Sequence, residues 1–338
     1  MKILVITSIA QKISPLMQNI FAIASENNCQ TILVGDQKSG NLEGAGLRSI
    51  SPEEQINFSW KIVDQLPWNS YSRKNIGYLE ALKTGARWVI ETDDDNLPSR
   101  EFFDLDSSLN LEVRMASNMS WLNIYKYFGN QVVWPRGFPL RKILEQKTAA
   151  LPVATITLDS IGVFQALADN DPDVDAIFRL THALPQHFSS GLPVLLSNGT
   201  VCPFNAQATW WNAKYAVLMY FPTTISWRVA DIWRSYIATF ILQANSVGIV
   251  FTGPLVTQIR NSHDLLIDFK EEIDCYLQAE NMWESLSEID PKTVYGEMTG
   301  ALLKVYEYLV EKGFIPQEEI VILESWISDI ETIQCLNK

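Results

Sequence analysis

Residues 87–98, with the sequence RWVIETDDDNLP, constrain the structure of this chain more than any other stretch. An apolar run, Trp88 to Ile90, is typical of a buried strand, and three consecutive aspartates follow it at 93–95. Neighbouring carboxylates about 5 Å apart repel each other by roughly 3 kcal/mol at an effective dielectric constant near 20. The stretch therefore predicts a buried strand that ends in a turn suited to binding a cation.

Side chains alternate between two faces in an extended chain. Asp93 and Asp95 would therefore point to one side and could bind one divalent cation, while Asp94 would point to the other. A solvated acidic turn, closed by Asn96 and Pro98, is the competing interpretation. The strand in front of the aspartates favours the metal site.

The composition, 47% hydrophobic and 19% charged, is that of a soluble folded protein. The 338 residues suffice for one large or two modest domains, and the net charge of −13 argues against nucleic acid or an anionic membrane as the main partner. No signal peptide and no apolar run near 18 residues is visible, so we expect no membrane span and a cytoplasmic location. The four cysteines lack CxxC spacing, so we expect reduced thiols.

The first part of the chain has the pattern of an α/β protein. Residues 2–9 and 31–35 are short apolar strands, and the segment between them has helical spacing, which is typical of a mainly parallel sheet flanked by helices. Ligands bind at the carboxyl ends of such strands. Asp36 and Lys38, just after the second strand, are therefore candidates for contacting a base, ribose or phosphate, although a loop without a ligand fits equally well.

The last part of the chain has acidic, helical patterns at 266–288, 293–312 and 317–333. We therefore predict a catalytic domain at 1–265 and a helical appendage at 266–338, which packs on the core or mediates homo-oligomerisation. No chemistry is expected in the appendage. An acidic turn at 169–175 lacks the spacing of a calcium loop and is expected to be structural.

Residues 66–86 predict a helix that begins after Asn69 or Ser70. Arg73 and Lys74 would lie in its first turns, where positive charge opposes the helix dipole. That placement is explained if both side chains reach for phosphates bound at the helix start. Solvated surface charges are the alternative.

These motifs carry a family resemblance. An RKNxGY helix followed by a strand and a D-x-D-type triplet resembles the nucleotide-sugar core of GT-A glycosyltransferases. More narrowly, PWNSYSRKNIGYLEALKTGA with ETDDDN resembles the STELLO proteins, and it is more distantly similar to the reversibly glycosylated polypeptides, which act as UDP-arabinopyranose mutases. The resemblance implies a GT-A-like fold and a metal-dependent transferase with a nucleotide sugar, UDP-linked, as donor and an acceptor that is unknown.

Arg136 lies in VVWPRGFPLR, which resembles the RGYP segment whose arginine becomes glycosylated in the mutases. Their second arginine lies seven residues on, whereas Arg141 lies five on, which puts a mutase mechanism in doubt. Physically, these two arginines could bind a diphosphate. Packing or an ion pair is the rival interpretation.

Residues 201–236 offer further polar groups. Asn205 and Gln207 suit sugar hydroxyls, and Trp210 and Trp211 are either stacking faces or core. In RVADIWRSY, Arg228, Asp231 and Arg234 are spaced three apart and lie near one face of a helix. STELLO-like sequences carry a similar RVxDIWR, and the resemblance implies that Asp231 contacts or deprotonates the acceptor. An internal Asp–Arg ion pair is the alternative.

The segment RNSHDL resembles the RNxH of STELLO-like proteins. This implies His263 as a metal ligand beside Asp93 and Asp95, with Mn²⁺ or Mg²⁺ as the cation and Arg260 near the diphosphate. The residues expected to contact the nucleotide sugar are Asp36, Lys38, Arg73, Lys74, Asp93, Asp94, Asn205, Gln207, Arg228, Arg234 and Arg260, and the catalytic candidates are Asp231 and Arg136. A sugar mutase and a catalytically silent scaffold module are the alternative functions.

Overall fold

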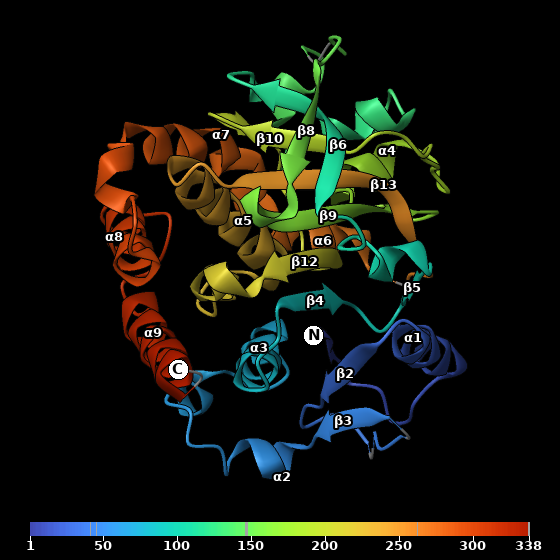
Figure 1. The fold of residues 1–338 in the computed structure, drawn as a ribbon, viewed down its shortest axis with the longest axis vertical. Coiled ribbons are helices and arrows are strands. Elements are labelled where there is room, and N and C mark those ends of the chain that lie inside the picture. The colour runs from blue at the N-terminus through green and yellow to red at the C-terminus, as the bar shows by residue number, and fades with distance from the viewer. Residues whose placement is uncertain (41, 45, 146–147, 262, 337–338) are drawn as a thin grey trace.

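The structure, a computed structural model, describes all residues except 41, 45, 146–147, 262 and 337–338. A large mixed sheet forms its centre and helices flank the sheet, as predicted (Figure 1). The strands, in their order across the sheet, are β3 (Leu47–Ile50), β2 (Cys29–Val34), β1 (Lys2–Thr7), β4 (Trp88–Thr92), β12 (Ala208–Asn212), β9 (Ile161–Asp169), β13 (Gly248–Gln258), β10 (Val194–Ser197), β6 (Asn110–Ser117) and β8 (Val153–Thr157).

Two smaller pairings complete the strands: β5 (Asn96–Pro98) adds to β13, and β7 (Ser120–Trp121) pairs with β11 (Thr200–Val201). The α-helices are α1 (Pro15–Glu26), α2 (Pro52–Gln55), α3 (Lys74–Lys83), α4 (Ala176–Thr181), α5 (Trp227–Ala244), α6 (Leu265–Glu271), α7 (Ile273–Glu288), α8 (Met298–Glu311) and α9 (Glu319–Leu336). None of the described helices is long and apolar enough to cross a membrane.

The sheet changes direction beside the aspartates. Strands β3, β2, β1 and β4 are parallel to one another, whereas β12 runs antiparallel to both β4 and β9. The parallel strands β1, β2 and β4 end at the same edge, so the loops that follow them lie side by side there. This edge is where an open α/β sheet binds ligands.

Alternation along the strands explains why the sheet is buried on both faces. In β4, Val89 belongs to one hydrophobic cluster and Trp88 and Ile90 to the other, on the opposite face. Helix α3 lies so close to β1 that a Cβ at Gly77 would overlap the Val5 side chain. The glycine of the RKNxGY motif therefore allows α3 to pack directly on the strand next to β4.

The C-terminal helices contribute carboxylates to loops of the sheet domain. Helices α7, α8 and α9 follow one another along one side of the molecule, and α9 ends beside α3 (Figure 1). Glu319, at the start of α9, is buried and accepts hydrogen bonds from the Tyr220 hydroxyl and from the backbone N–H groups of Thr223, at 2.9 Å, and Thr224, at 2.7 Å. Asp329 likewise accepts from the N–H groups of Lys61 and Ile62.

We predict that Glu319→Ala lowers the free energy of unfolding by about 1.5–3 kcal/mol, because three donors lose a charged acceptor. Urea denaturation followed by tryptophan fluorescence measures the change. The exposed neighbour Glu318 is the matched control, and Glu318→Ala should leave the unfolding midpoint unchanged. Equal midpoints for the two variants would show that Glu319 does not hold the 220–224 segment.

Candidate functional site

Two adjoining pockets lie at the carboxyl edge of the sheet. The pocket that we call inner is lined by Asp93, Arg136, Asp231 and Arg260 among others, and the outer one by Ser8, Asp36, Arg73 and Asp94 among others. Both are lined by Tyr71, Asp95, Trp227 and His263. The outer pocket has a volume of about 530 Å³, within the range of roughly 300–1,000 Å³ that is usual for small-molecule sites.

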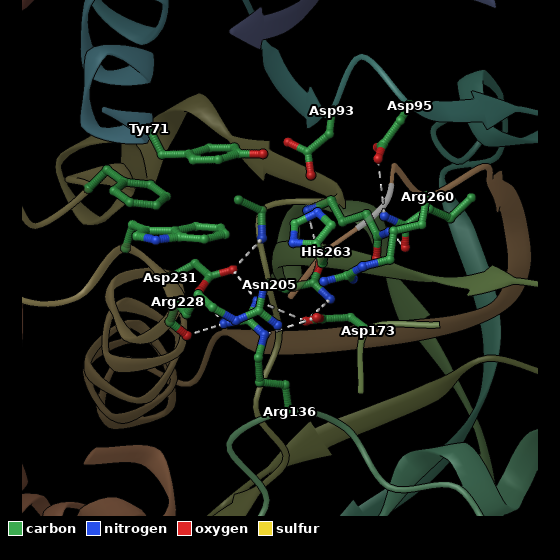
Figure 2. A pocket seen from close by; sticks show the side chains of 15 residues that line it. Tyr71, Asp93, Asp95, Arg136, Asp173, Asn205, Arg228, Asp231, Arg260 and His263 are labelled. Carbon is green, nitrogen blue, oxygen red and sulfur yellow. Dashed lines mark hydrogen bonds and ion pairs between the residues drawn. The ribbon is translucent and has the colours of Figure 1, made fainter. Parts of the chain in front are cut away.

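The three aspartates after β4 divide between the two pockets. Asp93 and Asp95 line the inner pocket (Figure 2), while Asp94 lines the outer pocket and accepts a hydrogen bond from the Ser8 hydroxyl. The separation is partial, because Asp95 also lines the outer pocket and residues 94 and 95 form a turn instead of continuing the extended chain. Asp95 also accepts a hydrogen bond from the Asn96 side chain at 2.9 Å.

Positive charge beside the aspartates is scarce. The Lys74 ammonium is fully buried, lies 3.1 Å from the Asp93 carboxylate and also donates to two backbone carbonyls, so it does not extend into either pocket. Burial raises the pKa of Asp93 even with Lys74 beside it. Burial, followed by the charges of Asp93 and Asp94, raises the pKa of Asp95 to about 7. A cation in the inner pocket would relieve this repulsion.

Arg136 forms the floor of the inner pocket and lies between two buried carboxylates (Figure 2). Its guanidinium donates to Asp173 at 2.9 and 3.0 Å, to Asp231 at 2.9 and 2.8 Å, and to the Arg228 carbonyl. All five N–H groups of the side chain thus have acceptors. Burial opposes the charge, but Asp173 and Asp231 hold the pKa of Arg136 above its usual value.

Asp231 is therefore half of an ion pair, although its partner is Arg136 and neither of the arginines on its own helix. Each of its carboxylate oxygens accepts an N–H of Arg136, and one also accepts from the Ala206 backbone at 3.3 Å. The carboxylate still lines the inner pocket. It has a fixed orientation there and can accept a further hydrogen bond from a hydroxyl group.

Two carboxylates that the sequence did not single out hold the remaining cations of the inner pocket. Glu272 receives Arg228 Nε at 2.6 Å, and Asp268 lies 3.5 Å from Arg228, 3.3 Å from Arg260 and 3.5 Å from His263. Both lie in the segment interpreted as an appendage without chemistry, and both are buried. Their four-residue spacing places them on one side of the helical segment, and this spacing is the sequence signal that could have identified them.

Arg260 is the least neutralised arginine of the inner pocket. Its single ion pair among the described residues is the one to Asp268, and its Nε is buried without an acceptor. Burial, and then the positive charges of Arg179 and Arg228, lower the pKa of Arg260. A buried cation in this state favours an anionic ligand.

His263 lies between the two pockets, in the centre of Figure 2. Burial and then the charge of Arg260 lower the pKa of its imidazole, which is therefore neutral at pH 7. Among the described residues no three His, Cys, Asp or Glu side chains lie close enough together to enclose a metal ion. His263 contacts Asp268 instead of completing a preformed set with Asp93 and Asp95.

Aromatic and amide side chains complete the walls. Trp210 and Trp211 are fully buried core residues, so the stacking role considered for them is wrong, and the exposed pair at the pocket is Tyr71 and Trp227, whose rings stack at 5.4 Å. The predicted amides line the inner pocket, but both are held by neighbours: Asn205 donates to Asp173 and Gln207 to Gln258.

Six predicted ligand residues do not line the inner pocket: Lys74 and Asp94, described above, and Asp36, Lys38, Arg73 and Arg234. Asp36 and Arg73 line the outer pocket, where Asp36 accepts the N–H groups of residues 69 and 70 and Arg73 donates to Gln55 and Leu66. Lys38 is exposed and lines neither pocket. Arg234 also lines neither, because it is buried in an ion pair with Glu91 at 2.7 Å.

The chain matches known proteins in sequence. A family model described as "STELLO glycosyltransferases" matches residues 228–336. Over 326 aligned residues, 89% of this chain, it is 23% identical to "Probable glycosyltransferase STELLO2" and to "Probable glycosyltransferase STELLO1", both of Arabidopsis thaliana. The chain is related to the STELLO glycosyltransferases. It spans 41% of the length of each of these two STELLO proteins.

The STELLO family match begins at Arg228 and so contains Asp231, Arg260, His263 and Asp268. Among solved structures, the chain is similar to the crystal structure of M. tuberculosis glucosyl-3-phosphoglycerate synthase. The TM-score is 0.40 and the identity 10%, over 82% of this chain and 80% of that one.

We predict that Arg136→Met lowers the free energy of unfolding by about 3–5 kcal/mol, because it leaves Asp173 and Asp231 buried without their cation. Chemical denaturation measures the loss. Arg141→Met removes the same charge from an exposed position five residues on and should be neutral within about 0.5 kcal/mol. A stable Arg136→Met protein would contradict the role of this ion-pair set in the fold.

Proposed function

We propose that this protein is a metal-dependent glycosyltransferase whose donor is a nucleotide sugar, UDP-linked. The observation that carries the proposal is the composition of the inner pocket: two partly buried carboxylates, Asp93 and Asp95, face the same pocket as the under-neutralised Arg260. The carboxylates favour a divalent cation and the arginine favours an anion. A metal-bound diphosphate combines the two.

In this proposal the nucleoside binds in the outer pocket, at the ends of β1 and β2. The diphosphate lies at the junction, near Asp95, His263 and Arg260, and the sugar enters the inner pocket. Asn205 and Gln207 then face the sugar, while Asp36 and Arg73 shape the nucleoside site. Lys74 acts on the donor only indirectly, because it holds Asp93.

The residues present fit a hard divalent cation such as Mn²⁺ or Mg²⁺, because carboxylate oxygens are its preferred ligands and these partly buried carboxylates repel each other. Asp93, Asp95 and His263 would hold it. Bound there, the metal neutralises the diphosphate and stabilises the leaving nucleotide. Water and phosphate oxygens supply the other ligands.

Asp231 is proposed to bind the acceptor hydroxyl in the inner pocket. Its pairing with Arg136 fixes the orientation of the carboxylate, so hydrogen bonding and orientation of the acceptor are its main contributions. Arg136 and Arg228 form ion pairs that stabilise the wall of the inner pocket around Asp231, and neither needs to contact substrate. The proposal thus keeps Asp231 in the site and assigns Arg136 to its support.

The geometry around Arg136 argues against the mutase alternative. A glycosylated arginine must attack the anomeric carbon with a nitrogen lone pair, whereas this guanidinium is charged and donates all five N–H groups. Incubation with UDP-arabinopyranose should therefore yield no furanose form and no label on Arg136. Either product would favour the mutase.

We predict that calorimetry with a panel of UDP-sugars detects binding to at least one of them and that this binding requires Mn²⁺. Asp95→Ala should weaken it by more than about tenfold, or 1.4 kcal/mol, because the metal loses a carboxylate. Asp104→Ala removes an exposed carboxylate nearby and should change nothing. Metal-dependent binding that survives in Asp95→Ala would exclude the metal site, and no binding to any sugar would favour the scaffold alternative.

We also predict that Arg260→Gln weakens UDP binding by about tenfold or more while uridine binding is retained, since a charge-assisted hydrogen bond to a diphosphate is worth about 1.5–3 kcal/mol. Competition binding with the two ligands measures the difference. Arg100→Gln, at an exposed arginine, serves as control. Equal losses for uridine and UDP would mean that Arg260 does not contact the diphosphate.

A further inference from the structure

We propose that Asp268 is a positioning residue that sets the tautomer of His263: the imidazole donates its Nδ1–H to Asp268 and presents the Nε2 lone pair to the pockets. The inference rests on the proposed function, in which His263 is a metal ligand. It extends that function into the C-terminal segment, where no site residue was predicted. Asp268 would act on the metal only through His263.

The contact that carries the inference is the one between His263 Nδ1 and Asp268 Oδ1, at 3.5 Å. Asp268 is 3% exposed. The His263 side chain is 30% exposed and lines both pockets. Nδ1 of the ring therefore lies beside a buried carboxylate, while the residue itself lines both pockets.

The contact with Asp268 determines which nitrogen of the neutral imidazole carries the proton. A neutral imidazole carries one N–H and one lone pair, and the hydrogen bond made by one nitrogen determines which role the other has. A carboxylate accepts only, so it selects the tautomer with the proton on Nδ1. Metal-binding histidines commonly donate their second nitrogen to such a carboxylate, and losing that partner typically weakens metal binding by about 10–100-fold.

The neighbouring charges leave Asp268 available for this task. Arg228 has its own strong acceptor in Glu272, and its contact with Asp268 Oδ1, at 3.5 Å, is as long as the contact of His263 with the same oxygen. Arg260 contacts the other oxygen of Asp268, at 3.3 Å. One carboxylate thus orients both the proposed metal ligand and the proposed diphosphate ligand, and it offers a separate oxygen to each.

The first test reads the tautomer without any metal. The chain has three histidines, so ¹⁵N-histidine NMR, with His263→Gln for assignment, resolves the signals of His263 in the full-length protein. We expect the Nδ1–H form in the wild type and a loss of that preference in Asp268→Ala. A wild-type His263 with its proton on Nε2 would overturn the proposal.

The second test measures the dissociation constant of Mn²⁺ in the presence of UDP, by electron paramagnetic resonance of the free ion. We expect Asp268→Asn to weaken Mn²⁺ binding by about 10–100-fold. Asp274→Asn, an exposed carboxylate six residues on, should leave it unchanged. In a His263→Ala background, Asp268→Asn should weaken Mn²⁺ binding by much less than in the wild type, because only the contact of Asp268 with Arg260 is then lost.

The outcomes separate this inference from the proposed function. Normal Mn²⁺ binding in Asp268→Asn, or equal effects with and without His263, overturns the role of Asp268 and leaves the metal site intact. No Mn²⁺ binding by the wild type overturns both. Circular dichroism on each variant identifies misfolding, and the wild-type tautomer decides the question if Asp268 variants do not fold.

Discussion

Arg136 is the charged group on which the geometry of the inner pocket depends. Its guanidinium joins three segments that are remote in the sequence: its own loop, the turn that carries Asp173, and α5 through Asp231. Burying any one of these charges alone would cost several kcal/mol, so each is stable only in the presence of the others. The floor of the pocket is therefore fixed by charge in the way that the faces of the sheet are fixed by packing.

The features that follow from local pattern were predictable. The strand before the aspartates and the α/β architecture follow from side-chain alternation and hydrophobic spacing. Alternation also predicts that Asp94 points away from Asp93, as it does, although Asp95 lines both pockets. The partners of charged residues were not predictable. Lys74 was expected to reach phosphate but is buried against Asp93, and Arg234 pairs with Glu91 in the core. Such pairings are set by tertiary packing, which a single sequence does not display.

The C-terminal segment shows the same limit. Its helical periodicity predicts which residues face inward, but it does not reveal which residues they contact. Asp268 and Glu272 form ion pairs with arginines of the inner pocket. Glu319 and Asp329 accept hydrogen bonds from loops of the sheet domain. The STELLO family model matches residues 228–336, so its match spans the predicted boundary at residue 265 and includes both Asp231 and these helices. Physically, the helices are part of the frame that holds the site.

The wall common to the two pockets makes them thermodynamically dependent on each other. Tyr71, Asp95, Trp227 and His263 line both, so a ligand that shifts these side chains from one side changes the free energy of binding on the other. By linkage, the factor is the same in both directions. The affinity of one pocket, measured while the other pocket is empty, therefore differs from its affinity when the other pocket is filled. A substitution selected for its effect on ligand binding in one pocket also changes binding in the other.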